Sequence, residues 1–316
     1  MIGAVLVQAV QMALVLTLAP GLIGLVRKVK ARLLRRRGPS VLQPYRDLLR
    51  LLRKEVVLAE GASWLFRVTP YLVFAAIWIA ASLVPTFATG LLFGPAADVI
   101  VIVALLGSAR FFLALAGLDV GTSFGGIGSS REMMIASLAE PAMLMIVFVL
   151  SLLAGTTQLS AIATFMLTTE VGLRVSLGLA LVGLVIVALA ENARIPVDNP
   201  ATHLELTMVH EAMVLEYSGR HLALIEAAGA IKLLLYMSLI ACVFAPWGMA
   251  APGGGPLAAT VGLAAYAVKV ALAGALLAVF ETSIAKMRVF RVNEFLGGAL
   301  LLGLLATLLL FVSKSF

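Results

Sequence analysis

The chain has 316 residues, of which 62% are apolar and only 12% are charged. Soluble domains carry roughly 25% charged residues, so the composition excludes a soluble globular protein and favours one whose apolar side chains face lipid. The net charge is +7, but 12 of the 23 Lys and Arg residues lie between Arg27 and Arg67, directly after the first apolar run. Basic residues clustered beside a membrane helix are an orientation signal, so we expect no nucleic acid as a partner.

Eight apolar runs are long enough to cross a bilayer, which takes about 20 residues. They cover approximately residues 2–26, 69–89, 97–118, 132–154, 171–190, 222–245, 257–281 and 295–313. The first run has no Lys or Arg before it, unlike a cleaved signal peptide, and we expect it to be retained. The predicted fold class is an all-α integral membrane protein with about eight transmembrane helices, in which residues 1–316 form a single polytopic domain.

Basic residues outside these spans fall almost entirely on one side. The predicted loops at about 27–68, 119–131, 191–221 and 282–294 hold most of them, whereas the opposite side holds only Arg174 and Lys314. By the positive-inside rule these four loops are cytoplasmic and both termini lie outside.

The first cytoplasmic loop contains a second kind of helix. Pro44 suits the first turn of a helix, and the residues after it alternate between an apolar and a basic face at helical spacing. The apolar face holds Tyr45, Leu48, Leu49, Leu52 and Val56, and the basic face holds Arg46, Arg50, Arg53 and Lys54. We expect an amphipathic helix that lies along the membrane surface.

A glycine-rich segment, Gly121 to Gly128, follows the third span. It lacks the GxGxxG pattern and follows a membrane helix instead of a strand, which argues against a phosphate-binding loop. We expect a tight cytoplasmic turn.

Few residues could hold a redox cofactor. Cys242 is the only cysteine, which excludes a disulfide within the chain and any iron–sulfur cluster or zinc finger held by about four ligands of this type. The three histidines, His203, His210 and His221, lie outside the predicted spans, whereas a haem between helices needs histidine ligands inside them. We therefore expect this chain to bind no redox cofactor.

Ionisable side chains inside the predicted spans are the first candidate functional residues, because each costs at least about 2.5–3.5 kcal/mol at the bilayer centre. They are Arg110, Glu140, Lys232 and Lys269, with Glu226 and Glu281 nearer the cytoplasmic ends. Arg110 and Glu140 each lie nine residues from the cytoplasmic end of adjacent spans, so we predict that they pair. The pair is either a lock between helices or a station on a proton path, and Lys269 either exchanges protons or reaches a carboxylate.

The acidic loop between the fifth and sixth spans holds the second set of candidates. They are Glu191, Arg194, Asp198, His203, Glu205, His210, Glu211 and Glu216. A helix is expected to begin at Thr202, with Glu205 completing a capping box. The histidines lack the HExxH spacing of a metal site, so the loop is interpreted as a solvated helix or as a proton-handling or docking surface.

Two segments carry a family resemblance. RRRGPSVLQPYRDLLRLLRKE, Arg35 to Glu55, and AENARIPVDNP, Ala190 to Pro200, resemble segments of the subunit 1 family of respiratory complex I. LDVGTSFGGIGSSRE and THLELTMVHEAMVLEYSG, which begin at Leu118 and Thr202, are similar to the membrane subunits of formate hydrogenlyase and hydrogenase-4 in the membrane-bound nickel–iron hydrogenases. Complex I proteins usually have Phe where this chain has Val197, which places a quinone tunnel in doubt.

The resemblance implies a non-catalytic subunit of the prokaryotic plasma membrane that anchors a soluble electron-transfer arm and links it to ion translocation. The implied partners are the hydrogenase large and small subunits, an iron–sulfur subunit and antiporter-like membrane subunits, all around a lipid bilayer. Nickel–iron and iron–sulfur centres are expected in those partners, and quinone binding is left open. The coupling residues that the resemblance implies are Glu191, Arg194, Asp198, Glu205, Glu211 and Glu216.

Three alternatives stand beside this interpretation. The first is a quinone-site subunit of NADH:quinone oxidoreductase. The second is a stand-alone cation transporter, against which the absence of a repeat between the two halves argues. The third is a passive anchor, which has no reason to bear the insertion cost of buried charges.

Overall fold

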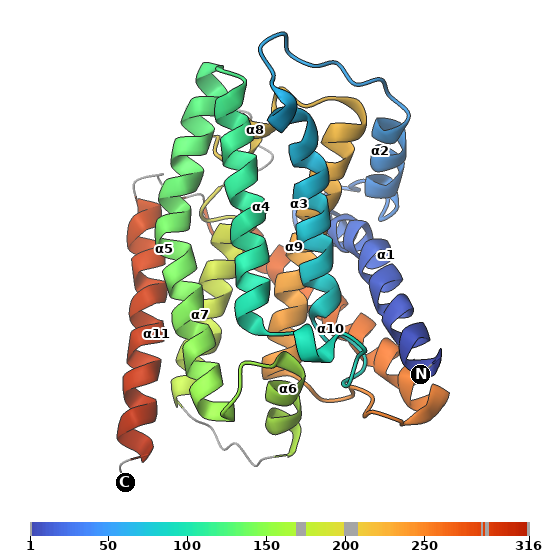
Figure 1. Cartoon of the computed structure of the whole chain (residues 1–316), viewed down its shortest axis with the longest axis vertical. Helices are drawn as coiled ribbons and strands as arrows, with labels where there is room; N and C mark the ends of the chain where they lie inside the picture. The colour runs from blue at the N-terminus through green and yellow to red at the C-terminus, as the bar shows by residue number, and fades with distance from the viewer. Residues whose placement is uncertain (1, 169–174, 199–207, 286, 288–290, 315–316) are drawn as a thin grey trace.

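A computed structural model describes residues 2–168, 175–198, 208–285, 287 and 291–314. Its helices are α1 Ile2–Leu33, α2 Gln43–Leu52, α3 Trp64–Leu83, α4 Val99–Asp119, α5 Ser123–Ala154, α6 Leu159–Thr168, α7 Val175–Glu191, α8 His210–Val214, α9 Gly219–Phe244, α10 Gly255–Ser283 and α11 Val292–Lys314 (Figure 1). Seven of these described helices are long and apolar enough to cross a membrane, namely α1, α3, α4, α5, α9, α10 and α11. The predicted all-α membrane fold is therefore confirmed.

The remaining predicted span, the fifth at about 171–190, corresponds to α7. Its described part, Val175–Glu191, has 17 residues, while residues 171–174 of the predicted span lie outside the described residues. Both chain ends lie toward the lower end of the molecule in Figure 1, and α2 and α8 lie toward the upper end. This placement agrees with an even number of crossings, whereas which side is cytoplasmic stays a prediction.

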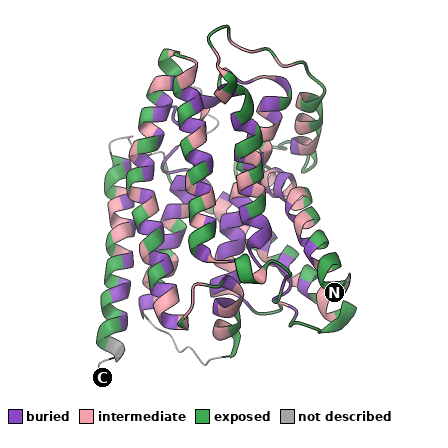
Figure 2. Cartoon of the chain, viewed as in Figure 1, coloured by how far each residue is buried: buried purple, intermediate pink, exposed green. Residues whose placement is uncertain are grey.

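Helix α9 forms the centre of the bundle. It packs against α1, α2, α3, α6, α7 and α10, and 67% of its most apolar window is buried. Helices α3, α4, α5, α11 and α7 follow one another around it, while α1 pairs with α10. Figure 2 shows that α10 and α11 turn much of their surface outward, and only 22% and 33% of their apolar windows are buried. Exposed apolar helix faces of this kind are suited to lipid or to neighbouring membrane chains.

The second span ends earlier than the sequence predicted. It was expected to reach residue 89, but α3 ends at Leu83 and Val84 is extended, with ψ 119°. Val84 precedes Pro85, whose ring disfavours helical backbone at the preceding residue. The chain then crosses the end of the bundle, where the Thr89 amide donates to the Ala250 carbonyl over 3.0 Å.

The glycine-rich segment forms a turn only up to residue 122, so the prediction of a turn as far as Gly128 is wrong. Gly121 has φ +70° and Thr122 caps the next helix, but α5 already begins at Ser123, so most of the expected loop 119–131 is helical. The glycines serve close packing instead. A Cβ on Gly125 would clash with the carbonyl oxygen of Gly117 in α4, so only glycine permits this approach of the two backbones.

The short helices α2 and α8 differ in how well they were predicted. Helix α2 covers most of the predicted amphipathic segment but ends at Leu52, so Arg53, Lys54 and Val56 lie beyond it. Pro44 is buried, and the Tyr45 hydroxyl donates to the Thr17 carbonyl of α1. The helix expected to begin at Thr202 starts outside the described residues. It does not run unbroken into α8, because Met208 and Val209 are not helical and α8 holds only five residues.

Candidate functional site

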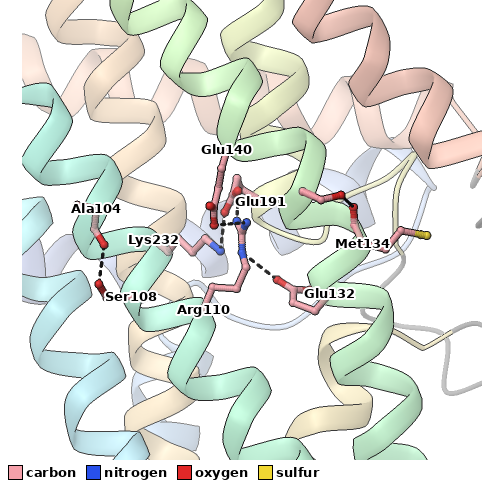
Figure 3. A network of polar contacts seen from close by, with 9 residues as sticks. Ala104, Ser108, Arg110, Glu132, Met134, Glu140, Glu191 and Lys232 are labelled. Carbon is pink, nitrogen blue, oxygen red and sulfur yellow. Dashed lines mark hydrogen bonds and ion pairs between the residues drawn. The ribbon is translucent and has the colours of Figure 1, made fainter.

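The centre of the site is the guanidinium of Arg110, which α4 holds inside the bundle. Its side chain is only 3% exposed and is surrounded by three carboxylates (Figure 3). The Nε atom lies 3.4 Å from Glu132, Nη1 lies 3.3 Å from Glu140, and Nη2 contacts Glu191. The predicted pairing of Arg110 with Glu140 is therefore confirmed, within a larger cluster.

Lys232 of α9 completes the charge cluster. Its Nζ lies 3.1 Å from the second oxygen of Glu191, at the end of α7. The charge cluster thus draws one or two side chains each from α4, α5, α7 and α9, and it brings three carboxylates to two cations. The charge cluster therefore holds one carboxylate more than its two cations.

The local sequence explains how α5 reaches Arg110. Glu132 and Glu140 are eight residues apart, slightly more than two helical turns, so both point to the α4 side. Gly107 leaves room on α4, because a Cβ there would lie 3.4 Å from the Glu140 Oε1 atom. Glu132 is a site residue that the sequence analysis missed, since it counted residue 132 as the first residue of a span, and the helical spacing to Glu140 was the available signal.

A polar cavity of about 230 Å³ joins the charge cluster to the loops at the end of the bundle that holds α2 and α8. Its wall includes Glu132, Glu191 and Lys232 of the cluster. A smaller cavity of about 30 Å³ shares Glu132 and Lys232 with it and reaches Arg110. The other polar lining residues are Arg27, Asp47, Asn192, Arg194, Asp198, His210, Glu211 and Glu226. A connected row of ionisable groups therefore leads from the loop side of the bundle to Arg110.

His210 stands where the two cavities meet. Burial lowers the pKa of its imidazole below the ordinary value, and the nearby carboxylate of Glu132 partly opposes that shift. The side chain is therefore neutral at pH 7, with one ring nitrogen able to accept a proton and the other able to donate one.

Several residues of the predicted docking loop have an interior position instead. Glu191 and Asp198 are 7% and 3% exposed, so the expectation of an exposed docking face is wrong for these two. The reason is that α7 continues to Glu191 and carries it to Arg110. His203 and Glu205 lie outside the described residues, while Glu211 and Glu216 are partly exposed.

Glu281 and Lys269 do not join the charge cluster. Glu281, in the last turn of α10, pairs with Lys30 and Arg194. Lys269 donates to the carbonyls of Ala245, over 2.6 Å, and Trp247, just beyond the C-terminus of α9. The interpretation that Lys269 reaches a carboxylate is wrong within the described part of the chain, because the carbonyls that follow the helix hold its amine. Proton exchange by Lys269 stays a prediction.

Metal ligation has no support in the described part of the chain. No group of three or more His, Cys, Asp or Glu side chains there has the geometry to hold a metal ion. Cys242 is buried and reduced in α9, as expected for a small apolar residue.

The fold and the charge cluster define a multi-pass membrane protein with ionisable side chains buried between its helices. A family model described as NADH dehydrogenase matches residues 5–312, and the chain belongs to this family. The resemblance to the complex I subunit 1 family is thereby confirmed.

The similar proteins include hydrogenase-type membrane subunits and subunits of NADH-quinone oxidoreductase, the two groups that the sequence resembles. The chain is 33% identical over 287 residues to formate hydrogenlyase subunit 4 of Escherichia coli (strain K12), covering 90% of this chain and 91% of the relative. It is 34% identical to hydrogenase-4 component C of the same organism, over 76% of this chain and 75% of the relative. It is 30% identical to an NADH-quinone oxidoreductase subunit of Geobacter metallireducens (strain ATCC 53774 / DSM 7210 / GS-15), over 74% and 76% of the two chains.

The fold also has a solved counterpart. A chain in the structure of the membrane-bound sulfane sulfur reductase, an archaeal respiratory membrane complex, matches with a TM-score of 0.78 and 20% identity. The match covers 96% of this chain and 99% of that chain, so the whole helical arrangement is shared.

Proposed function

We propose that this chain is the membrane-anchoring and coupling subunit of a complex I-like membrane-bound hydrogenase of the formate hydrogenlyase type. Full-length similarity to formate hydrogenlyase subunit 4 supports this assignment. In the proposal, partner subunits hold the nickel–iron and iron–sulfur centres, antiporter-like chains adjoin it in the plasma membrane, and both termini lie outside. This chain then contributes proton handling and mechanical linkage.

The observation that carries the proposal is the charge cluster at the inner end of the polar cavity. The cluster has three carboxylates for two cations, so one carboxylate is available to hold a proton. This position is reached from the cavity and is shielded from bulk water. A structural lock between helices needs only one carboxylate per cation. The surplus carboxylate and the connected cavity favour a relay station over a lock.

Glu140 gives the relay a direction. Its side chain is 44% exposed, whereas those of Arg110 and Glu191 are 3% and 4% exposed. The Glu140 carboxylate is therefore the partly exposed member of the charge cluster, and it lies beside Arg110 (Figure 3). A proton that enters from the cavity side can pass by Glu132 and Glu191 and leave through Glu140 to a neighbouring membrane chain.

A second function, the quinone-site subunit of an NADH:quinone oxidoreductase, is favoured by one specific observation. The cavity wall combines apolar side chains, Pro20, Ile23 and Leu48, with the polar groups named above, which suits an amphipathic ring. Relatives named as subunits of NADH-quinone oxidoreductase add to this alternative.

Purification of the tagged chain from its native membranes, anaerobically and in mild detergent, separates the two functions. Nickel content and hydrogen evolution from a reduced dye that copurify with the tag are the expected results. An iron-rich, nickel-free complex that reduces quinone would instead support the alternative, and a chain that purifies alone would contradict both.

A further inference from the structure

Glu281 ties together three elements that lie far apart in the sequence. One carboxylate oxygen lies 2.7 Å from Lys30 Nζ of α1, and the other lies 3.6 Å from Arg194 Nη1, just after α7. The Glu281 side chain is 2% exposed and comes from the last turn of α10. This carboxylate is the counterion that Lys30 and Arg194 share.

Arg194 is the last residue of a strained helix end. Its amide donates to the Leu189 carbonyl over 2.9 Å, and the Ala193 amide donates to the Ala190 carbonyl over 3.1 Å. These two bonds form a Schellman motif, whose left-handed residue is usually glycine. Here it is Ala193, at φ +47°, a conformation that disfavours residues with a Cβ atom. The turn therefore depends on outside contacts to keep its shape.

The same turn holds a central residue of the charge cluster. Glu191, which contacts Arg110 and Lys232, is three residues before Arg194. One side of the strained turn is thus bound to α4 and α9, and the other side is bound through Glu281 to α10 and α1. If Arg194 loses its contact with Glu281, the resulting movement falls on Asn192, Ala193 and Arg194. These residues line the polar cavity.

We infer that Glu281 is a positioning residue that holds Arg194 and thereby sets the Glu191 carboxylate against Arg110 and Lys232. The effect of Glu281 on the shape of the turn follows from the contacts alone. An effect of Glu281 on coupled ion transport rests in addition on the proposed function. In this inference Glu281 acts through Arg194 and is not a station on the proposed proton route. Lys30 orients the Glu281 carboxylate but does not contact the turn.

The turn can be monitored directly with a cysteine at its centre. Asn192 is half-buried beside the cavity, and the native Cys242 is buried, so maleimide labelling of Asn192→Cys in the purified native complex reports opening of the turn. Glu281→Gln is expected to raise the labelling rate by roughly fivefold to thirtyfold, the range for losing one stabilising contact. Arg32→Gln, which removes an exposed cation from the same last turn of α1, is the matched control and should stay within about twofold of the parent rate.

A double variant tests the route of action. If Glu281 acts through Arg194, then Arg194→Gln has the same effect as Glu281→Gln, and combining them adds nothing. Ala193→Gly removes the need for a strained alanine, so it should reduce the effect of Glu281→Gln. Glu281→Asp keeps the charge and should label at an intermediate rate, which keeps the test available if the Gln variant does not accumulate.

The inference is overturned by an unchanged labelling rate in Glu281→Gln, by an equal increase in Arg32→Gln, or by additive effects in the double variant. Faster labelling with normal coupled ion transport would keep the positioning role and count against the proposed function instead. The two failures are therefore distinguishable in the same preparations.

Discussion

Lys269 shows how a charged side chain within the membrane can have a structural role. Lys269→Met leaves the carbonyls of Ala245 and Trp247 without their donor. Hydrogen bonds to charged groups contribute about 1.5–3 kcal/mol, so we expect a lower apparent melting temperature in detergent with coupled ion transport retained. Thr260→Val, on the exposed face of the same helix, is the control and should leave stability unchanged. Loss of transport at normal stability would place Lys269 on the proton path.

His210 predicts a pH dependence of stability. Burial lowers the pKa of this histidine in the folded chain, so the folded state takes up a proton less readily than the unfolded state. Stability is then full above the ordinary histidine pKa of about 6.5 and is lost as the pH falls toward the lower folded value. His210→Gln should weaken this acid sensitivity, as measured by melting temperatures between about pH 5 and pH 7.5. An identical pH profile in the variant would show that other groups cause it.

At the scale of residues, sequence reasoning found part of the charge cluster. Arg110 and Glu140 were paired correctly, because depth along two adjacent helices can be counted from their charged ends. Glu132 was missed because it was counted as the first residue of a span, and Glu191 was assigned to a loop because α7 extends one residue beyond its apolar run. The partners of Lys269 are backbone carbonyls, and side-chain patterns carry no information about those.

At the scale of elements, the contact of α4 with α5 depends on a glycine. The Cβ of Gly125→Ala would meet the Gly117 carbonyl of the neighbouring backbone, so we expect a loss of about 1–3 kcal/mol and a lower melting temperature. Gly126→Ala is the matched control, since nothing lies within 4 Å of its Cβ, and it should be neutral or slightly stabilising. Equal melting temperatures for the two variants would contradict this packing.

The element boundaries show where apolar patterns stop being informative. Helix α5 begins nine residues before the predicted span, because glycine and serine residues outside an apolar run still form helix when they pack on α4. Helix α6 was not predicted at all, since ten residues after Gly155 are too few for a span. Helix α2 was predicted well, because its period and its proline are local signals.

At the scale of the whole molecule, the orientation can be measured with two cysteines. Gly254 lies before α10 and Gly61 lies between α2 and α3, both exposed and at opposite ends of the bundle. Gly254→Cys should react with an impermeant maleimide in intact cells, and Gly61→Cys should react only after permeabilisation. Buried Cys242 contributes little background. The reverse labelling pattern would invert the proposed topology.

Composition and charge asymmetry sufficed to predict a multi-pass helical membrane protein, because lipid and the positive-inside rule act on the chain as a whole. They did not predict that α9 lies at the centre or that α1 pairs with α10. Which helices pack together depends on contacts between residues far apart in the sequence, such as Lys30 with Glu281.

The relay through the charge cluster is tested most directly by Glu140→Gln in the native complex reconstituted into vesicles, with ion movement measured per hydrogen evolved. We expect normal assembly and dye-linked hydrogen evolution but at least about tenfold slower ion movement, because a positioned proton-transfer group contributes roughly 10²–10⁴-fold to rates. Glu60→Gln, in the exposed loop before α3, should behave like the parent. Parental coupling in Glu140→Gln would remove the charge cluster from the ion path and leave it a lock between helices.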